Sequence, residues 1–292
     1  MGSPEFPPGS CDCHVHVIGP TRQYPMAADR HYTPGLASPR SLRAHMAQNG
    51  LSRAVIVQPS VYGTDNTCLL DSLQEMEGAA RGIAVVESGA GDDLLRNLSA
   101  NGVCGLRINV ESAGLQDPKA VGHALQYWSE RLAPLNWHIQ IYASLDTVAA
   151  AVPYLGELSV PVVFDHFGLV PAFTADTDSR VESVLEWVRT GRAYVKLSAP
   201  YRLPSTEQDS SEAVSRLAAR YLQANPERVL WGSDWPHTDR EAGKQAHEVS
   251  AYRVIPSGAL EKDITTWLPS STLLQQVLVD NAARLYHWPA GR

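Results

Sequence analysis

The 292-residue sequence carries a formal net charge of −7 at pH 7, and 44% of its residues are apolar. This balance excludes a disordered chain, and the length allows one large barrel or two modest domains. Because phosphate contacts need clustered Lys and Arg, the acidic charge without any basic run argues against nucleic-acid binding. No stretch of about 18 apolar residues occurs, so we expect no membrane span.

Residues 1–6 resemble a cloning remnant, and we take residues 7–292 as one domain. The chain does not open with a charged start and an apolar segment, so we expect no signal peptide. A strand would place the thiols of Cys11 and Cys13 on one face, which is poor geometry for a mutual disulfide. Together with Cys68 and Cys104, they favour a reduced, cytoplasmic protein.

Short apolar runs alternate with amphipathic segments along the whole chain. The runs cover residues 11–18, 53–58, 81–87, 103–110, 138–142, 162–165, 193–197 and 229–231. Helical patterns between them include residues 41–49, 120–132, 180–190 and 211–224. Eight strand–helix units in about 250 residues predict an α/β fold, a single-domain (β/α)8 TIM barrel. A doubly wound sheet is the alternative, but no Gly-x-Gly-x-x-Gly follows the first run.

Functional residues of such a barrel lie at the carboxyl ends of its strands. In the first run, strand periodicity places Asp12, His14 and His16 on one face, which we expect to line the barrel. Cys11, Cys13 and the valines would then pack on the helices. Two imidazoles at this spacing can face one metal ion or one substrate oxygen.

The fourth and fifth runs carry further polar residues. Arg107 lies in an apolar strand and needs a partner, either a substrate carboxylate or an internal ion pair. Tyr142 ends the fifth run and would reach the mouth of the barrel. His138, at the start of that run, is typical of a core histidine.

The last three runs add an acid, a base and cations. His166 follows the sixth run, where catalytic residues lie. Lys196 in the seventh is predicted to pair with a carboxylate, with a Schiff-base role as the alternative. Arg202, in the next loop, could hold an anionic group. Asp234, after the eighth run, is predicted to be a general base, with a helix N-cap as the alternative.

Histidines in the first run and after the sixth, with an aspartate after the eighth, resemble the amidohydrolase superfamily. Longer strings resemble its 2-pyrone-4,6-dicarboxylate lactonase branch over almost the whole chain past Cys11. These strings are Asp12-Cys13-His14-Val15-His16, Arg30-His31-Tyr32-Thr33-Pro34, Gln58-Pro59-Ser60, Asp165-His166-Phe167-Gly168 and Ser233-Asp234-Trp235-Pro236-His237.

The resemblance implies a barrel enzyme that hydrolyses or isomerises lactones from aromatic or sugar-acid breakdown. By position, Asp234 would activate water and later protonate the leaving oxygen. His14, His16 and His166 would polarise the lactone carbonyl. The implied substrate-binding residues are Arg107, Tyr142, Arg202, Tyr32, His237, Gln58 and Ser60.

Two positions depart from the pattern of that branch. Ala113 and Leu169 stand where the dicarboxylate lactonase has additional arginines. Two missing cations imply a less anionic substrate, so we expect a lactone with one carboxylate or none.

The sequence favours catalysis without a metal ion. The ends of the fourth and fifth runs offer Arg107 and Tyr142, which are poor ligands for the second ion of a binuclear site. A single Zn or Mn ion held by His14, His16 and Asp234 is the alternative.

Several other functions remain open. A lactone isomerase would use the same site. A metal-dependent decarboxylase or amide hydrolase, a non-catalytic binding protein and a Schiff-base aldolase using Lys196 are the further alternatives. The expected partner is a small-molecule lactone.

Overall fold

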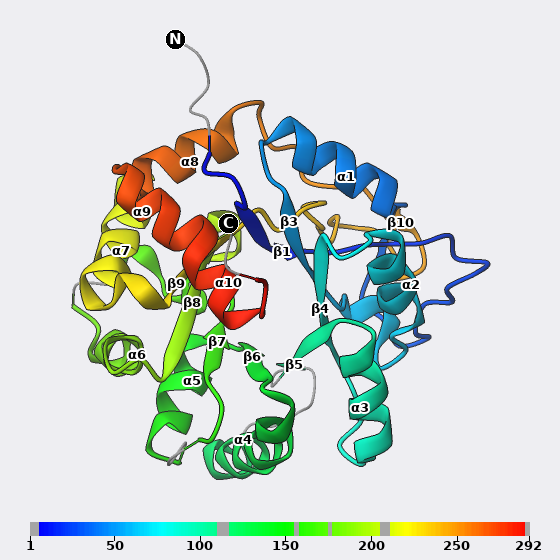
Figure 1. The fold of residues 1–292 in the computed structure, drawn as a ribbon, viewed down its shortest axis with the longest axis horizontal. Helices are drawn as coiled ribbons and strands as arrows, with labels where there is room; N and C mark the ends of the chain where they lie inside the picture. The colour runs from blue at the N-terminus through cyan, green and yellow to red at the C-terminus, as the bar shows by residue number, and fades with distance from the viewer. Residues whose placement is uncertain (1–5, 110–116, 155–157, 175–176, 205–210, 290–292) are drawn as a thin grey trace.

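The computed structural model describes residues 6–109, 117–154, 158–174, 177–204 and 211–289 (Figure 1). Eight parallel strands pair in the order β1-β3-β4-β5-β6-β7-β8-β9. They confirm the eight predicted runs and the barrel. Their bounds are β1 (Cys11–Val15), β3 (Arg53–Val57), β4 (Ala80–Ala84), β5 (Val103–Asn109), β6 (His138–Tyr142), β7 (Val162–Phe164), β8 (Ala193–Ser198) and β9 (Val229–Gly232).

The barrel is closed by residues that follow β9. The amide of Asp234 donates to the carbonyl of His14 at 2.9 Å, and the amide of His16 donates to the carbonyl of Trp235 at 2.7 Å. This seam sets the segment after β9 directly beside the end of β1. The polar residues of both segments are therefore brought to the same end of the barrel.

Helices surround the barrel (Figure 1), and their bounds are α1 (Pro39–Gln48), α2 (Thr67–Glu75), α3 (Asp92–Ala100), α4 (Pro118–Leu132), α5 (Leu145–Ala151), α6 (Ser179–Arg189) and α7 (Ser211–Ala224). The first of them shows how the sequence sets its bounds. Ser38 caps the helix by accepting from the amide of Ser41, Pro39 occupies the first turn, and Gly50 follows with φ of +65°.

The chain ends in α8 (Ala259–Trp267), α9 (Ser271–Gln275) and α10 (Asn281–Leu285), with a π-helical turn at Gln276–Asp280. In Figure 1, α10 crosses the end of the barrel that faces the viewer. The Asn281 amide donates to the carbonyls of Pro226 and Val229, at the start of β9. This helix therefore covers the N-terminal end of the barrel. We call this end the floor. None of the described helices is long and apolar enough to cross a membrane.

The expected facing of β1 is wrong for Asp12 and the cysteines. The pairing of β1 with β3 shifts register between Asp12 and Val15. Cys11 and Cys13 belong to a buried cluster that draws residues from most of the strands, whereas Asp12 lies 3.3 Å from His45 of the surrounding helix α1. Such a bulge inserts a residue and reverses the facing on one side of it, so His14 and Asp12 lie on different faces.

A two-stranded ribbon, which the sequence analysis did not predict, lies outside the barrel. It pairs β2 (Thr33–Pro34) with β10 (Val249–Ser250) in parallel. The Thr33 hydroxyl also donates to the carbonyl of Ala246 at 2.7 Å. This ribbon fixes the segment that carries Tyr32 to the open end of the barrel.

Candidate active site

A cavity of about 150 Å³ lies at the carboxyl ends of the strands. We call this end of the barrel the mouth. The cavity is bounded by side chains from segments far apart in the sequence. They are His16, Tyr32, Pro59, Ser60, Arg107, Tyr142, His166, Arg202, Asp234 and Thr238. Eight of the residues predicted for catalysis or substrate binding, Tyr32 included, are among them.

Asp234 is fully buried, and one of its oxygens faces three imidazoles. Asp234 Oδ1 lies 3.7 Å from His14 Nε2, 3.6 Å from His16 Nε2 and 3.9 Å from His166 Nε2. Asp234 and His166 both adopt left-handed backbone conformations, with φ of +63° and +47°. Backbone strain of this kind is found mainly where a side chain must be aimed at a functional site.

Hydrogen bonds on the far side of the rings indicate which nitrogens carry protons. His16 Nδ1 lies 2.8 Å from the carbonyl of Val57, which can only accept, so Nδ1 carries the proton and Nε2 presents a lone pair. His14 Nδ1 lies 3.2 Å from Asp165 Oδ1, which favours the same tautomer. Both rings therefore aim lone pairs at Asp234.

The second oxygen of Asp234 is held by a phenol and a guanidinium. Tyr201 Oη donates to Asp234 Oδ2 at 2.9 Å, and Arg202 Nε donates to it at 2.6 Å. Burial would raise the pKa of Asp234, but the charge of Arg202 holds that pKa well below its usual range. Burial also lowers the pKa of His14 to about 3 and that of His166 well below its usual range. At neutral pH, Asp234 is ionised and these two rings are neutral.

A buried polar network lies beneath the cavity and is centred on Asp165. Lys196 Nζ lies 3.4 Å from Asp165 Oδ1 and donates to Gln140 Oε1 at 2.7 Å. Gln140 Nε2 and Arg107 Nε donate to Asp165 Oδ2 at 3.0 and 3.2 Å. Burial would raise the pKa of Asp165, yet Lys196, His14 and Arg107 hold it well below its usual range. Asp165 is therefore an ionised partner for His14.

The network favours one of the two alternatives for Lys196 but does not separate those for Arg107. Lys196 is fully buried and is not among the residues that line the cavity, which fits the predicted charge partner rather than a Schiff base. Arg107 lines the cavity and also pairs with Asp165. Both readings of Arg107 are thus compatible with its position. Asp234 caps none of the described helices and faces the imidazoles instead.

Two predicted substrate-binding residues lie behind the lining. The Gln58 amide donates to the carbonyls of Gly63 and Asp65, so it shapes the loop that carries Ser60. His237 Nδ1 lies 3.2 Å from Tyr201 Oη, and burial lowers its pKa to about 4.

Of the two positions that depart from the lactonase pattern, Ala113 lies outside the described residues. Leu169 is buried and is not among the residues that line the cavity.

Sequence reasoning gave no role to Asp165, Gln140 or Thr238. Thr238 Oγ1 accepts from Arg202 Nη2 at 2.9 Å and so fixes the guanidinium that holds Asp234. Arg107 and Lys196 were both predicted to lie inside one barrel, and two buried cations need a carboxylate near them. Asp165 could have been chosen as that carboxylate because it directly precedes His166 at the end of a strand.

The donor atoms around Asp234 form a set that fits a cation. The ligand atoms of His14, His16 and Asp234 lie within 4.8 Å of one another. His14 Nε2 and Asp234 Oδ1 are buried, and neither has a hydrogen-bond partner among the described residues. Two imidazole lone pairs and a carboxylate are a ligand set suited to a divalent ion such as zinc.

Comparisons with known proteins agree on one family. The family model described as Amidohydrolase matches residues 11–288. The 2-pyrone-4,6-dicarboxylate hydrolase of Comamonas testosteroni is 34% identical over 98% of this chain and 93% of its own length. The 4-sulfomuconolactone hydrolase of Hydrogenophaga intermedia is 29% identical over 96% and 89%. The D-galactarolactone isomerase of Agrobacterium fabrum is 26% identical over 97% and 93%.

Solved structures share the fold. A probable 2-pyrone-4,6-dicarboxylic acid hydrolase from Acinetobacter baumannii, with citric acid bound, has a TM-score of 0.81 and is 26% identical. It is matched over 96% of this chain and 100% of its own. An amidohydrolase from Burkholderia multivorans with bound zinc has a TM-score of 0.67 at 19% identity, covering 96% and 99%. Some proteins of this fold therefore bind a metal ion.

Proposed function

The chain belongs to the amidohydrolase family, and from this premise we propose that it hydrolyses the ester bond of a lactone. The observation that carries the proposal is the ionised Asp234, which lines the cavity with its Oδ1 within 3.9 Å of three imidazole nitrogens. A carboxylate so placed can take a proton from water at the point where water meets a carbonyl. The names of the relatives support a lactone as the substrate.

In the proposed reaction, the water oxygen bonds to the lactone carbonyl carbon while its proton passes to Asp234 Oδ1. Charge develops on the carbonyl oxygen, and His166 is positioned to donate to it when Ser198, at 2.8 Å from Nδ1, donates to that nitrogen. The ring C–O bond then breaks, and Asp234 returns the proton to the leaving oxygen. The new carboxylic acid ionises at neutral pH, so one proton is released per turnover.

The charge around the cavity supports a substrate with one anionic group. Among the described residues of the cavity and its network, three cations (Arg107, Lys196, Arg202) face two carboxylates (Asp165, Asp234). One positive charge is left over. Arg107 supplies it on the cavity wall, next to Tyr142, whose ring lies 5.1 Å from the guanidinium carbon. We propose that Arg107 holds the single carboxylate of the substrate.

We further propose that the same three residues, His14, His16 and Asp234, can hold one divalent ion. When bound, such an ion acidifies water and polarises a carbonyl. The His14 and His16 nitrogens that face the site carry no proton and cannot donate a hydrogen bond to an oxyanion. In the metal-free protein, His166 is therefore the imidazole that donates this hydrogen bond. Elemental analysis of protein purified without added metal, with activity measured before and after chelation, distinguishes the two forms.

The function is tested by pH-stat assay of lactones that carry zero, one or two carboxylates. We expect proton release to be fastest with one carboxylate, and Asp234→Asn to slow it by about 10²–10⁴-fold because the base is lost and the shape is kept. Asp239→Asn is the matched control, since Asp239 lies in the same segment and pairs with Arg253. Near-normal release by Asp234→Asn would remove the mechanism.

Isomerisation is a second candidate because one relative is named as a lactone isomerase. It moves the ester bond from one hydroxyl of the substrate to another and consumes no water. A lactone that is converted without proton release, through a step that Asp234→Asn abolishes, would favour the isomerase.

A further inference from the structure

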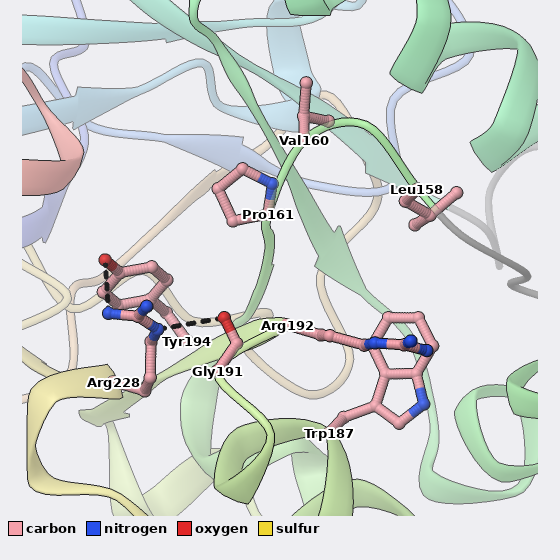
Figure 2. A pocket seen from close by; sticks show the side chains of 8 residues that line it. All are labelled: Leu158, Val160, Pro161, Trp187, Gly191, Arg192, Tyr194 and Arg228. Atoms are coloured by element: carbon pink, nitrogen blue, oxygen red, sulfur yellow. Dashed lines mark hydrogen bonds between the residues drawn. The ribbon is translucent and has the colours of Figure 1, made fainter.

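A larger cavity, of about 330 Å³, lies at the floor of the barrel (Figure 2). It is formed where β7, β8 and β9 begin. Its lining residues are Leu158, Val160, Pro161, Trp187, Gly191, Arg192, Tyr194 and Arg228. None of them lines the mouth, so the two cavities are separate.

One side of this cavity is a guanidinium held in a fixed position. Arg228 Nε donates to the carbonyl of Gly191 at 3.0 Å, and its Nη1 donates to Tyr194 Oη at 3.2 Å (Figure 2). The guanidinium carbon also lies 4.8 Å from the centre of the Tyr194 ring. These contacts keep Arg228 oriented without neutralising its charge, because both partners are uncharged.

The cavity offers hydrogen-bond donors and no carboxylate. Since the Tyr194 oxygen accepts from Arg228, its own proton remains available, and no acceptor for it is found within the described ranges. Arg192 is exposed, and in the part of the chain that the structure describes no carboxylate pairs with it. Arg228 and Tyr194 therefore offer hydrogen-bond donors to an anion on one side of the cavity, and the positive charge of Arg192 lies on the other side (Figure 2).

The remaining walls are apolar. Trp187 and Val160 are buried, and Leu158 and Pro161 are partly buried. In Figure 2, Trp187 and Arg192 lie on one side, Arg228 and Tyr194 on the other, and Pro161 between them. The volume is at the lower end of the range for small-molecule sites. A flat apolar body with one carboxylate matches these walls and donors.

We propose that the floor cavity is a binding site for a small aromatic monocarboxylate, separate from the catalytic mouth. The carboxylate lies beside Arg228 and accepts a hydrogen bond from the Tyr194 hydroxyl, and the charge of Arg192 on the opposite side adds to the attraction. The ring packs against Trp187 and Pro161. This proposal does not depend on the reaction carried out at the mouth.

The test is ¹⁹F NMR titration of the full chain with 4-fluorobenzoate. We expect saturable binding of one equivalent at the floor and no binding of 4-fluorobenzamide, which has the same shape without the charge. Arg192→Gln should weaken binding at least tenfold. Arg189→Gln, also near the end of α6 but paired with Glu186, is the matched control and should bind as the unmodified chain does.

Arg107→Met distinguishes the floor from the mouth, since a carboxylate could also bind Arg107. Binding that survives Arg107→Met and is weakened by Arg192→Gln supports the proposal. Three results would overturn the proposal. They are no saturable binding, equal binding of the benzamide, or binding that is lost in Arg107→Met and unchanged in Arg192→Gln. Arg192 is exposed, so its replacement should leave the fold intact.

Discussion

The mouth and the floor of this barrel both contain arginines, but the groups that hold them differ. At the mouth, Arg202 and Arg107 pair with the buried carboxylates Asp234 and Asp165. At the floor, Arg228 is held by a carbonyl and a phenol. Charge compensation at the mouth keeps a buried, reactive carboxylate ionised, whereas the floor keeps its positive charge for a ligand. One barrel thus separates chemistry from simple anion binding.

Removing one cation from each end is the largest perturbation of this comparison. Lys196→Met leaves the buried Asp165 short of compensating charge, so we expect the free energy of unfolding to fall by about 3–5 kcal/mol. Arg228→Met removes hydrogen bonds to uncharged partners and should lower it by about 1–2 kcal/mol. Urea unfolding at pH 7 measures both values.

The double variant Lys196→Met/Asp165→Asn tests the cause of that loss. Removing the carboxylate together with the lysine should recover part of the unfolding free energy, because no uncompensated charge remains buried. Equal losses in Lys196→Met and Arg228→Met, or no recovery in the double variant, would contradict the role assigned to charge compensation.

Arg107→Met sharpens the account of the mouth. If Arg107 holds the substrate carboxylate equally in the ground and transition states, KM should rise about 10- to 100-fold with little change in kcat. Steady-state kinetics on a monocarboxylate lactone measures this. Arg96→Met, on the outer helix α3, is the control for a lost surface arginine. An unchanged KM would assign Arg107 to its ion pair with Asp165 alone.

The pH dependence of stability should come from histidines and not from the carboxylates of the mouth. Burial lowers the pKa of His138, near the floor, to about 3. Below about pH 6.5, the unfolded chain binds a proton at this residue that the folded chain does not. The free energy of unfolding therefore decreases as the pH is lowered, by about 1.4 kcal/mol per pH unit for this group. His14 adds to the slope, whereas Asp234 and Asp165 stay ionised throughout this window.

His138→Gln isolates the share of this one residue. Urea unfolding at pH 7 and pH 5 should show a smaller loss on acidification in the variant than in the unmodified chain. The centres of the His138 and Tyr286 rings are 5.4 Å apart, so the variant loses a ring contact and starts from a lower free energy of unfolding. The quantity to compare is therefore the slope of the unfolding free energy against pH. Identical slopes would show that His138 is protonated in the folded state.

Much of the architecture could be predicted from the sequence because its causes are local. The alternation of apolar runs with helical patterns gave all eight strands, and the helical pattern at residues 41–49 overlaps α1 (Pro39–Gln48). Strand ends in a parallel barrel meet at one edge, so His14, His166 and Asp234 could be expected together without knowing any distance.

The tertiary structure alone decided how these residues face and which charges balance. Alternation along β1 could not reveal the bulge that turns Asp12 toward α1, because a bulge depends on the register with the neighbouring strand. Pairing of Lys196 with Asp165 and of Arg202 with Asp234 depends on which strand ends are adjacent. The sequence determines which groups reach each end of the barrel, while packing between distant segments determines which of them keep their charge.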